Sequence, residues 1–132
     1  MCILLTDDEY VYLIRQYRAV IDSYILEVVA GGMDKEGESR VDAARRELAE
    51  EARMKAEEII PRGFVYSSPG FCTEKLLLFE ARGLSSCDDF EMDEDEIIEQ
   101  VRVRREDVFS MISSGEISDA KTIALLTRVL AG

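Results

Sequence analysis

The pattern of apolar and polar positions divides the chain into strand-like and helix-like segments. Runs of aliphatic and aromatic residues bounded by polar or glycine-containing turns predict β-strands. The predicted strands cover residues 2–5, 10–18, 24–30, 59–67, 74–82 and 97–103. The turn Ser68-Pro69-Gly70-Phe71 joins two of them, and an acidic loop at 87–96 precedes the last.

Three helices are expected between and after these strands. Ser39 is a suitable N-cap for a helix that runs to about Met54. Its apolar positions recur at helical spacing and are Val41, Ala44, Leu48 and Ala52. Two shorter helices are expected near 105–113 and 119–131. Strands that alternate with helices predict an α/β or α+β fold, a mixed β-sheet sandwiched between α-helices.

Composition limits the classes of partner. Of the 132 residues, 28 are Asp or Glu and 16 are Lys or Arg, which gives a net charge of −12 at pH 7. A chain this acidic is repelled by nucleic acid and by anionic membranes, so neither is expected as a partner. An anionic small molecule is compatible with this charge where a metal ion or a local group of arginines offsets it.

The chain contains no histidine, which excludes Ser–His and Cys–His catalytic pairs and the most common zinc ligands. A general base must therefore be a carboxylate, a lysine, a tyrosine or a bound hydroxide. Cys2, Cys72 and Cys87 are odd in number and lack CxxC spacing, so free thiols in the reducing cytoplasm are expected. No stretch has the pattern of a signal peptide or a transmembrane helix.

Three carboxylates of the long predicted helix lie on one face. Glu47, Glu50 and Glu51 stand at positions i, i+3 and i+4, where like charges repel by about 0.2–0.5 kcal/mol per pair. A divalent cation such as Mg²⁺ reverses the sign of that interaction, because it prefers carboxylate and phosphate oxygens. From charge patterning alone, the alternative interpretation is a solvated acidic face.

The spacing around these glutamates resembles the Nudix box, Gly-x5-Glu-x7-Arg-Glu-U-x-Glu-Glu-x-Gly-U, in which U is a bulky aliphatic residue. The matching positions are Gly32, Glu38, Arg46, Glu47, Leu48, Glu50, Glu51 and Met54. One position departs from the pattern, since Arg53 stands where the family has glycine. If the backbone there is left-handed, a side chain costs about 1 kcal/mol.

This resemblance implies a Nudix fold and a metal-dependent hydrolase. It implies that Glu47, Glu50 and Glu51 bind divalent metal, with the carbonyl of Gly31 as a backbone ligand. Glu50 and Glu51 take a catalytic role in this assignment, and the expected cofactor is Mg²⁺, with Mn²⁺ as the alternative. The remaining box residues are expected to be structural, with an ion pair that locks the loop onto the helix, and they are Gly32, Glu38, Arg46 and Leu48.

Segments beyond the box resemble the ADP-ribose pyrophosphatase branch of the family. They are Leu13-Ile14-Arg15-Gln16-Tyr17-Arg18, Pro69, the acidic run 93–96, Ser114-Gly115-Glu116-Ile117 and Asp119-Ala120-Lys121-Thr122. The resemblance implies hydrolysis of ADP-ribose to AMP and ribose 5-phosphate by a cytoplasmic homodimer. A single Nudix domain over residues 1–132 is expected, lacking the N-terminal β region common in that branch.

The resemblance also supplies candidates for substrate contact. Arg15 and Arg18 are candidates for binding phosphate, and the alternative is ordinary surface charge on an edge strand. Pro69 and Phe71 are expected to shape the sugar side of the pocket, although Phe71 is equally suited to a core.

Glu96 in the acidic loop is the preferred general base, with Glu94 close by, and the alternative is an ordinary solvated loop. Two other functions stay open. One is a Nudix hydrolase of a different nucleoside diphosphate sugar or nucleotide, and the other is a Nudix module that binds a nucleotide without hydrolysing it.

Overall fold

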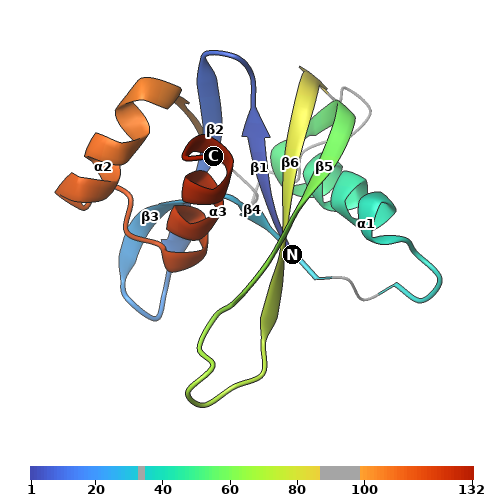
Figure 1. Cartoon of the computed structure of the whole chain (residues 1–132), viewed down its shortest axis with the longest axis horizontal. Helices are drawn as coiled ribbons and strands as arrows, with labels where there is room; N and C mark the ends of the chain where they lie inside the picture. The colour runs from blue at the N-terminus through green and yellow to red at the C-terminus, as the bar shows by residue number, and fades with distance from the viewer. Residues whose placement is uncertain (33–34, 87–98) are drawn as a thin grey trace.

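A computed structural model describes residues 1–32, 35–86 and 99–132 (Figure 1). The strands are β1 (Cys2–Thr6), β2 (Tyr10–Arg18), β3 (Ser23–Glu27), β4 (Val29–Ala30), β5 (Met54–Tyr66), β6 (Lys75–Ser86) and β7 (Glu99–Arg104). The helices are α1 (Arg40–Glu47), a π-helical segment (Leu48–Ala52), a 3-10 turn (Arg105–Asp107), α2 (Val108–Ser114) and α3 (Ala120–Leu130).

The strands join in one sheet of mixed direction. Its central order is β3-β2-β1-β6-β5, with β4 paired to β1 and β7 paired to β2. Strands β1 and β6 run parallel, with Ile3 opposite Phe79, and the other pairs of described strands are antiparallel. The mixed sheet predicted from the alternation of elements is therefore confirmed.

The sheet separates two apolar cores, each covered by helix. On one face, α1 and the π-helical segment after it bury Ala43, Ala44 and Leu48 against Ile3, Ile14, Phe79 and other sheet residues. On the opposite face, α2 and α3 bury Val108, Leu125 and Leu126 against Leu4, Leu13, Leu78 and their neighbours. Figure 1 shows α1 on one side of the sheet and the two C-terminal helices on the other.

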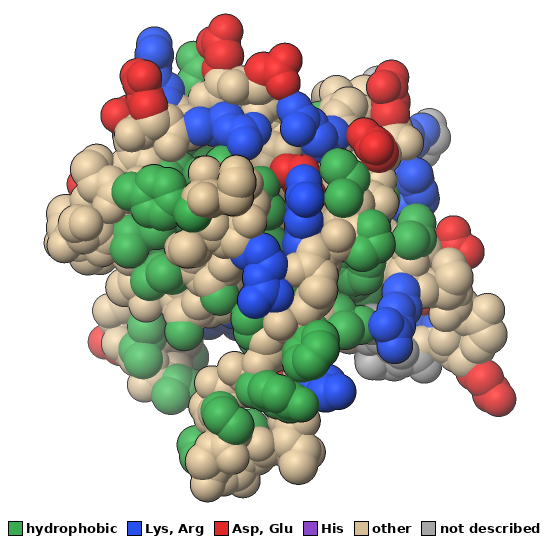
Figure 2. All heavy atoms as spheres, in the orientation of Figure 1, with side chains coloured by type: hydrophobic (Ala, Val, Ile, Leu, Met, Phe, Trp, Pro, Cys, Tyr) green, Lys and Arg blue, Asp and Glu red, His purple; other side chains and the backbone are tan. Residues whose placement is uncertain are grey.

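The surface over α2 and α3 mixes apolar and basic groups. Figure 2 shows hydrophobic side chains gathered over α2 and over the β5–β6 hairpin, with Lys and Arg between them and Asp and Glu mostly toward the edge. The exposed aromatic residues of the hairpin are Phe64, Tyr66 and Phe71. Within the described ranges, no helix has both the length and the apolar character needed to cross a membrane.

The long helix ends earlier than the sequence pattern predicts. Regular α-helix stops at Glu47, a π-helical segment continues to Ala52, and Arg53 adopts a left-handed conformation with φ 55° and ψ 38°. This residue reverses the chain, so Met54 begins β5 opposite Ser86. The helical segment thus ends at Ala52, two residues from the expected end near Met54. The expectation of a strand beginning at residue 59 was wrong, because sheet pairing extends β5 by five residues toward the helix.

The strand predicted over 24–30 is divided in two at Val28. Its backbone N–H leaves the sheet and donates to the Thr122 hydroxyl of α3 at 3.0 Å. On one side of this break β3 pairs with β2, and on the other side β4 pairs with β1. Because of this break, one apolar segment forms two short strands that pair with different neighbours, β2 and β1. The hydrogen bond at Val28 also connects the segment to α3.

Substituting Arg53 by glycine tests the left-handed helix exit. We expect Arg53→Gly to raise the free energy of unfolding by about 1 kcal/mol, because glycine adopts positive φ without the Cβ penalty. Arg53→Ala is the matched control, since it removes the side chain but keeps the Cβ, and no such gain is expected. Thermal unfolding measures both, and a melting temperature of Arg53→Gly at or below that of the wild type would contradict the prediction.

Candidate active site

The three helical carboxylates lie where α1 changes into the π-helical segment. Glu47 is the last residue of α1 and is only 7% exposed, whereas Glu50 and Glu51 belong to the segment that follows. Such π-helical turns occur frequently at functional sites, because they change the direction of side chains within one helix. The three glutamates at the end of α1 therefore differ in their solvent exposure.

Arg46 links the carboxylates to the preceding loop. Its guanidinium lies 3.2 Å from Glu38, 3.0 Å from Glu47 and 3.4 Å from Glu50, and it also donates to the carbonyl of Gly32 at 3.4 Å. The hydrogen bonds to Glu38, and then those to Glu47, raise the pKa of Arg46 above its usual range. The planar guanidinium with five donors suits this role better than a lysine would.

Gly31 provides space for the buried carboxylate of Glu47. A Cβ placed on Gly31 would lie 2.1 Å from Cδ of Glu47 and within 2.6 Å of both carboxylate oxygens. The carboxylate therefore lies directly against the backbone of Gly31, and any larger residue would displace it. The carbonyl of Gly31 accepts a hydrogen bond from the amino group of Met1 at 2.8 Å, which uses one of its two lone pairs.

The donor chemistry at this point fits a hard divalent cation. The carboxylates of Glu47, Glu50 and Glu51 and the carbonyl of Gly31 are oxygen ligands of the kind that Mg²⁺ prefers. Within the described residues, no three or more His, Cys, Asp or Glu side chains already converge in a metal-binding geometry. Glu47 and Glu50 are instead paired with Arg46, which balances their charge.

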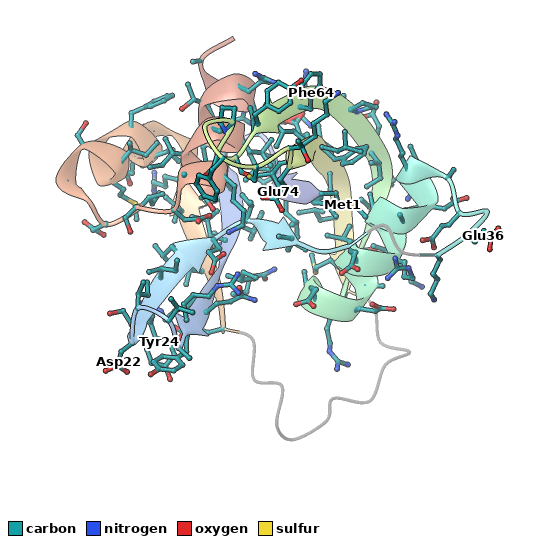
Figure 3. All side chains as sticks on the ribbon, turned by 90° about the horizontal axis from the view of Figure 1, so that it is seen from below. Met1, Asp22, Tyr24, Glu36, Phe64 and Glu74 are labelled. Atoms are coloured by element: carbon teal, nitrogen blue, oxygen red, sulfur yellow. The ribbon has the colours of Figure 1, made fainter. Side chains whose placement is uncertain are left out.

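A cavity of about 690 Å³ is lined in part by Gly31, the residue against which the Glu47 carboxylate lies. Its walls come from three places: the start of β1 with the end of β4, the β5–β6 hairpin, and the first turns of α3. The lining residues used below are Gly31, Ser67, Ser68, Glu74, Asp119 and Lys121. Figure 3 places Met1 and Glu74, which also line it, near the middle of the molecule. Its volume falls within the roughly 300–1,000 Å³ typical of small-molecule sites.

The two arginines predicted to bind phosphate are not placed together. Side chains alternate along a strand, so Arg15 and Arg18 lie on opposite faces of β2. Arg15 forms a partly exposed ion pair with Glu99 at 3.4 Å. Arg18 donates two hydrogen bonds to Glu27, which raise the pKa of its guanidinium, and the charge of Glu51 also contributes to that rise. Arg18 therefore lies within electrostatic range of Glu51, one of the helical carboxylates.

The predicted sugar contacts lie at the tip of the β5–β6 hairpin. Pro69 and Phe71 are both exposed, Phe71 by 88%. Neither residue is part of the described cavity lining, which includes the neighbouring Ser67 and Ser68. The two candidates for general base, Glu94 and Glu96, lie outside the described residues.

Comparisons with known proteins agree with this geometry. The NUDIX domain model matches residues 1–126, which is nearly the whole chain. The chain belongs to the Nudix family. Over 118 residues it is 36% identical to an ADP-ribose pyrophosphatase of Bacillus subtilis, covering 89% of this chain and 63% of that protein. The Nudix fold predicted from the box is thereby confirmed.

Other Nudix relatives differ in their named activities. A GDP-mannose pyrophosphatase of Yersinia enterocolitica is 35% identical over 108 residues, covering 80% of this chain and 55% of that protein. A solved crystal structure of an ADP compounds hydrolase superposes with a TM-score of 0.85 at 28% identity, covering 97% of this chain and 68% of that one. The chain thus spans less than two thirds of the length of the first curated relatives that it matches.

Sequence reasoning missed three residues that the fold brings together in one ion-paired cluster. Glu27 ends β3, and Asp119 and Lys121 lie at the start of α3, about ninety residues later in the chain. The similarity of Asp119-Ala120-Lys121-Thr122 to the ADP-ribose branch marked the segment without indicating its partner. The signal for Glu27 was its position as the single acidic residue within the apolar run 24–30.

The close approach of Gly31 and Glu47 predicts a specific effect of Gly31→Ala. The atoms that the new methyl group meets are the end of a flexible side chain, so the carboxylate moves while the fold stays intact. We expect Mn²⁺ affinity to fall by roughly 10–100-fold, the usual effect of disturbing the support of a metal ligand. Calorimetric Mn²⁺ titration, with the melting temperature as the control for folding, measures this effect. An unchanged Mn²⁺ affinity would contradict the assignment of Glu47 as a ligand.

Proposed function

We propose that the protein is a divalent-metal-dependent Nudix pyrophosphohydrolase that cleaves ADP-ribose to AMP and ribose 5-phosphate. The observation that carries this proposal is the Glu47 carboxylate held against Gly31, a residue that also lines the cavity, with Glu50 and Glu51 in the helical segment that follows. A protein that only binds a nucleotide has no need of this set of carboxylates. The similarity to the Bacillus subtilis ADP-ribose pyrophosphatase supports the choice of substrate.

Glu47, Glu50, Glu51 and the carbonyl of Gly31 hold the metal in this proposal. Bound divalent cations, with Mg²⁺ as the proposed ion, neutralise the diphosphate and lower the pKa of the attacking water. Arg46 keeps the carboxylates oriented through its contacts with Glu47 and Glu50. This arrangement also explains how a protein with a net charge of −12 binds an anionic substrate.

Groups outside the metal site bind and orient the rest of the substrate. Arg18 contacts the diphosphate in this proposal, because its guanidinium is partly exposed on the strand that resembles the ADP-ribose branch. The cavity beside Gly31 receives one of the two groups that the diphosphate joins. We keep Glu96 as the proposed general base, on the resemblance of the acidic loop to the ADP-ribose branch.

A second candidate substrate is a different nucleoside diphosphate sugar. The similarity to the GDP-mannose pyrophosphatase of Yersinia enterocolitica favours it, at an identity within one percentage point of that to the ADP-ribose enzyme. The metal site serves both reactions equally, because it acts on the shared diphosphate and not on the base or the sugar. We also propose, from the resemblance, that the protein acts as a homodimer in the cytoplasm.

Product analysis with purified protein and Mg²⁺ tests the proposed reaction. ADP-ribose, ADP-glucose, GDP-mannose and ATP are supplied in parallel, and the released nucleotides are separated by chromatography. We expect AMP and ribose 5-phosphate from ADP-ribose, and no release after addition of a chelator. Faster cleavage of GDP-mannose would support the second candidate, and no cleavage of any of the four would contradict the enzymatic proposal.

Replacing one metal-binding carboxylate separates catalysis from folding. We expect Glu51→Gln, and likewise Glu47→Gln, to lower kcat by at least about 100-fold, because each removes a charged ligand while preserving side-chain shape. The melting temperature should change little, since relief of carboxylate repulsion offsets lost ion pairing. Glu58→Gln, an exposed position on β5, is the matched control for charge. Activity near the wild-type level in both site variants would contradict the metal assignment.

A further inference from the structure

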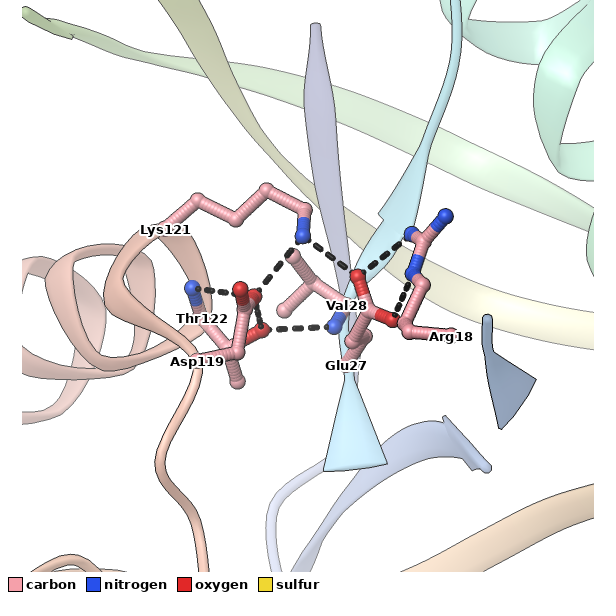
Figure 4. Close-up of polar contacts among 6 residues, drawn as sticks. All are labelled: Arg18, Glu27, Val28, Asp119, Lys121 and Thr122. Carbon is pink, nitrogen blue, oxygen red and sulfur yellow. Dashed lines mark hydrogen bonds and ion pairs between the residues drawn. The ribbon is translucent and has the colours of Figure 1, made fainter. Parts of the chain in front are cut away.

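A second polar cluster lies between β2, β3 and the start of α3, and it contains Arg18, Glu27, Asp119, Lys121 and Thr122 (Figure 4). Arg18 donates through Nε and Nη2 to the two carboxylate oxygens of Glu27, at 2.6 and 2.7 Å. Lys121 donates to Oε1 of Glu27 from the other side, and also to Asp119 at 2.9 Å. Glu27 thus bridges one cation from β2 and one from α3.

The burial of Glu27 explains why it needs both cations. The residue has no solvent exposure, and a buried carboxylate without partners is strongly unfavourable. Burial lowers the pKa of Lys121, but its hydrogen bonds to Glu27 and Asp119 outweigh that effect and raise it, so Lys121 stays charged. Arg18, Lys121, Glu27 and Asp119 together carry no net charge.

The net charge of this cluster determines whether the surroundings of Arg18 attract or repel an anion. Arg18 uses Nε and one terminal nitrogen for Glu27, and its side chain is still 46% exposed, so among the described residues its other N–H donors have no hydrogen-bond partner. Without the charge of Lys121, the two carboxylates would exceed the remaining cation by one charge. The surroundings of Arg18 would then repel the diphosphate that it is proposed to bind.

We propose that Lys121 is a positioning residue for substrate binding, which acts through Glu27 to hold Arg18 as an anion-binding group. This inference rests on the proposed function, because it assigns Arg18 to the diphosphate of that substrate. Asp119 anchors the lysine and caps α3 by accepting a hydrogen bond from the backbone of Thr122 at 3.2 Å. The start of α3 thereby contributes to a site on a strand more than a hundred residues earlier in the chain.

Steady-state kinetics with ADP-ribose and Mg²⁺ test this role. We expect Lys121→Met to raise KM by about tenfold, while kcat changes much less, since one charge near a partly buried ion pair is lost. Lys121→Gln keeps a donor for Glu27 but not the charge, and the same rise in KM is expected. Lys121→Arg should restore KM to near the wild-type value, and Arg104→Met, which removes a charge from an exposed ion pair elsewhere, should leave it unchanged.

A double-mutant cycle with Arg18→Met distinguishes positioning from a general structural role. If Lys121 acts through Arg18, adding Lys121→Met to Arg18→Met raises KM little further. A KM of Lys121→Met equal to that of Arg104→Met, or fully additive effects in the cycle, would overturn the inference while the proposed function stands. A lower melting temperature without a change in KM would also overturn it. If the wild-type protein releases no AMP, the proposed function fails, and the inference fails with it.

Discussion

The contacts of Arg46 are the interaction on which the candidate site depends. Three like-charged glutamates near one helix end repel one another, and Arg46 offsets this by pairing with Glu47 and Glu50. The same guanidinium reaches Glu38 and the carbonyl of Gly32, so it fixes the loop that carries Gly31. The position of the buried Glu47 carboxylate against Gly31 follows from both contacts. The Arg46 side chain thus both neutralises the nearby carboxylates and holds the loop beside them in place.

Much of the fold was predictable because its signals are local. The N-cap at Ser39, which accepts from Asp42 at 3.1 Å, and the box spacing identified the helix and its carboxylates from sequence alone. The missing glycine raised a left-handed exit at Arg53 only as a condition, and the structure shows that conformation. The π-helical segment and the early start of β5 were not anticipated. The start of β5 results from pairing with β6, which has no signature within the helix itself.

The second polar cluster escaped sequence reasoning for the same physical reason. Glu27 and Lys121 are 94 residues apart, and they meet because the chain leaves the sheet at Val28 to bond with Thr122. An acidic residue in an apolar run indicates a buried partner, but sequence alone does not name it. Three cations of this acidic protein, Arg46, Arg18 and Lys121, are paired with carboxylates.

The Nudix box carboxylates are proposed to bind divalent cations, which in turn bind the diphosphate of the substrate. A crystal structure with Mn²⁺ and a non-hydrolysable methylene analogue of ADP-ribose tests this most directly, because anomalous scattering locates Mn²⁺ independently of the surrounding atoms. Our account predicts Mn²⁺ peaks about 2.1–2.2 Å from oxygens of Glu47 and Glu51, with diphosphate oxygens completing the coordination. Mn²⁺ bound elsewhere, or a diphosphate that contacts none of these carboxylates, would contradict it.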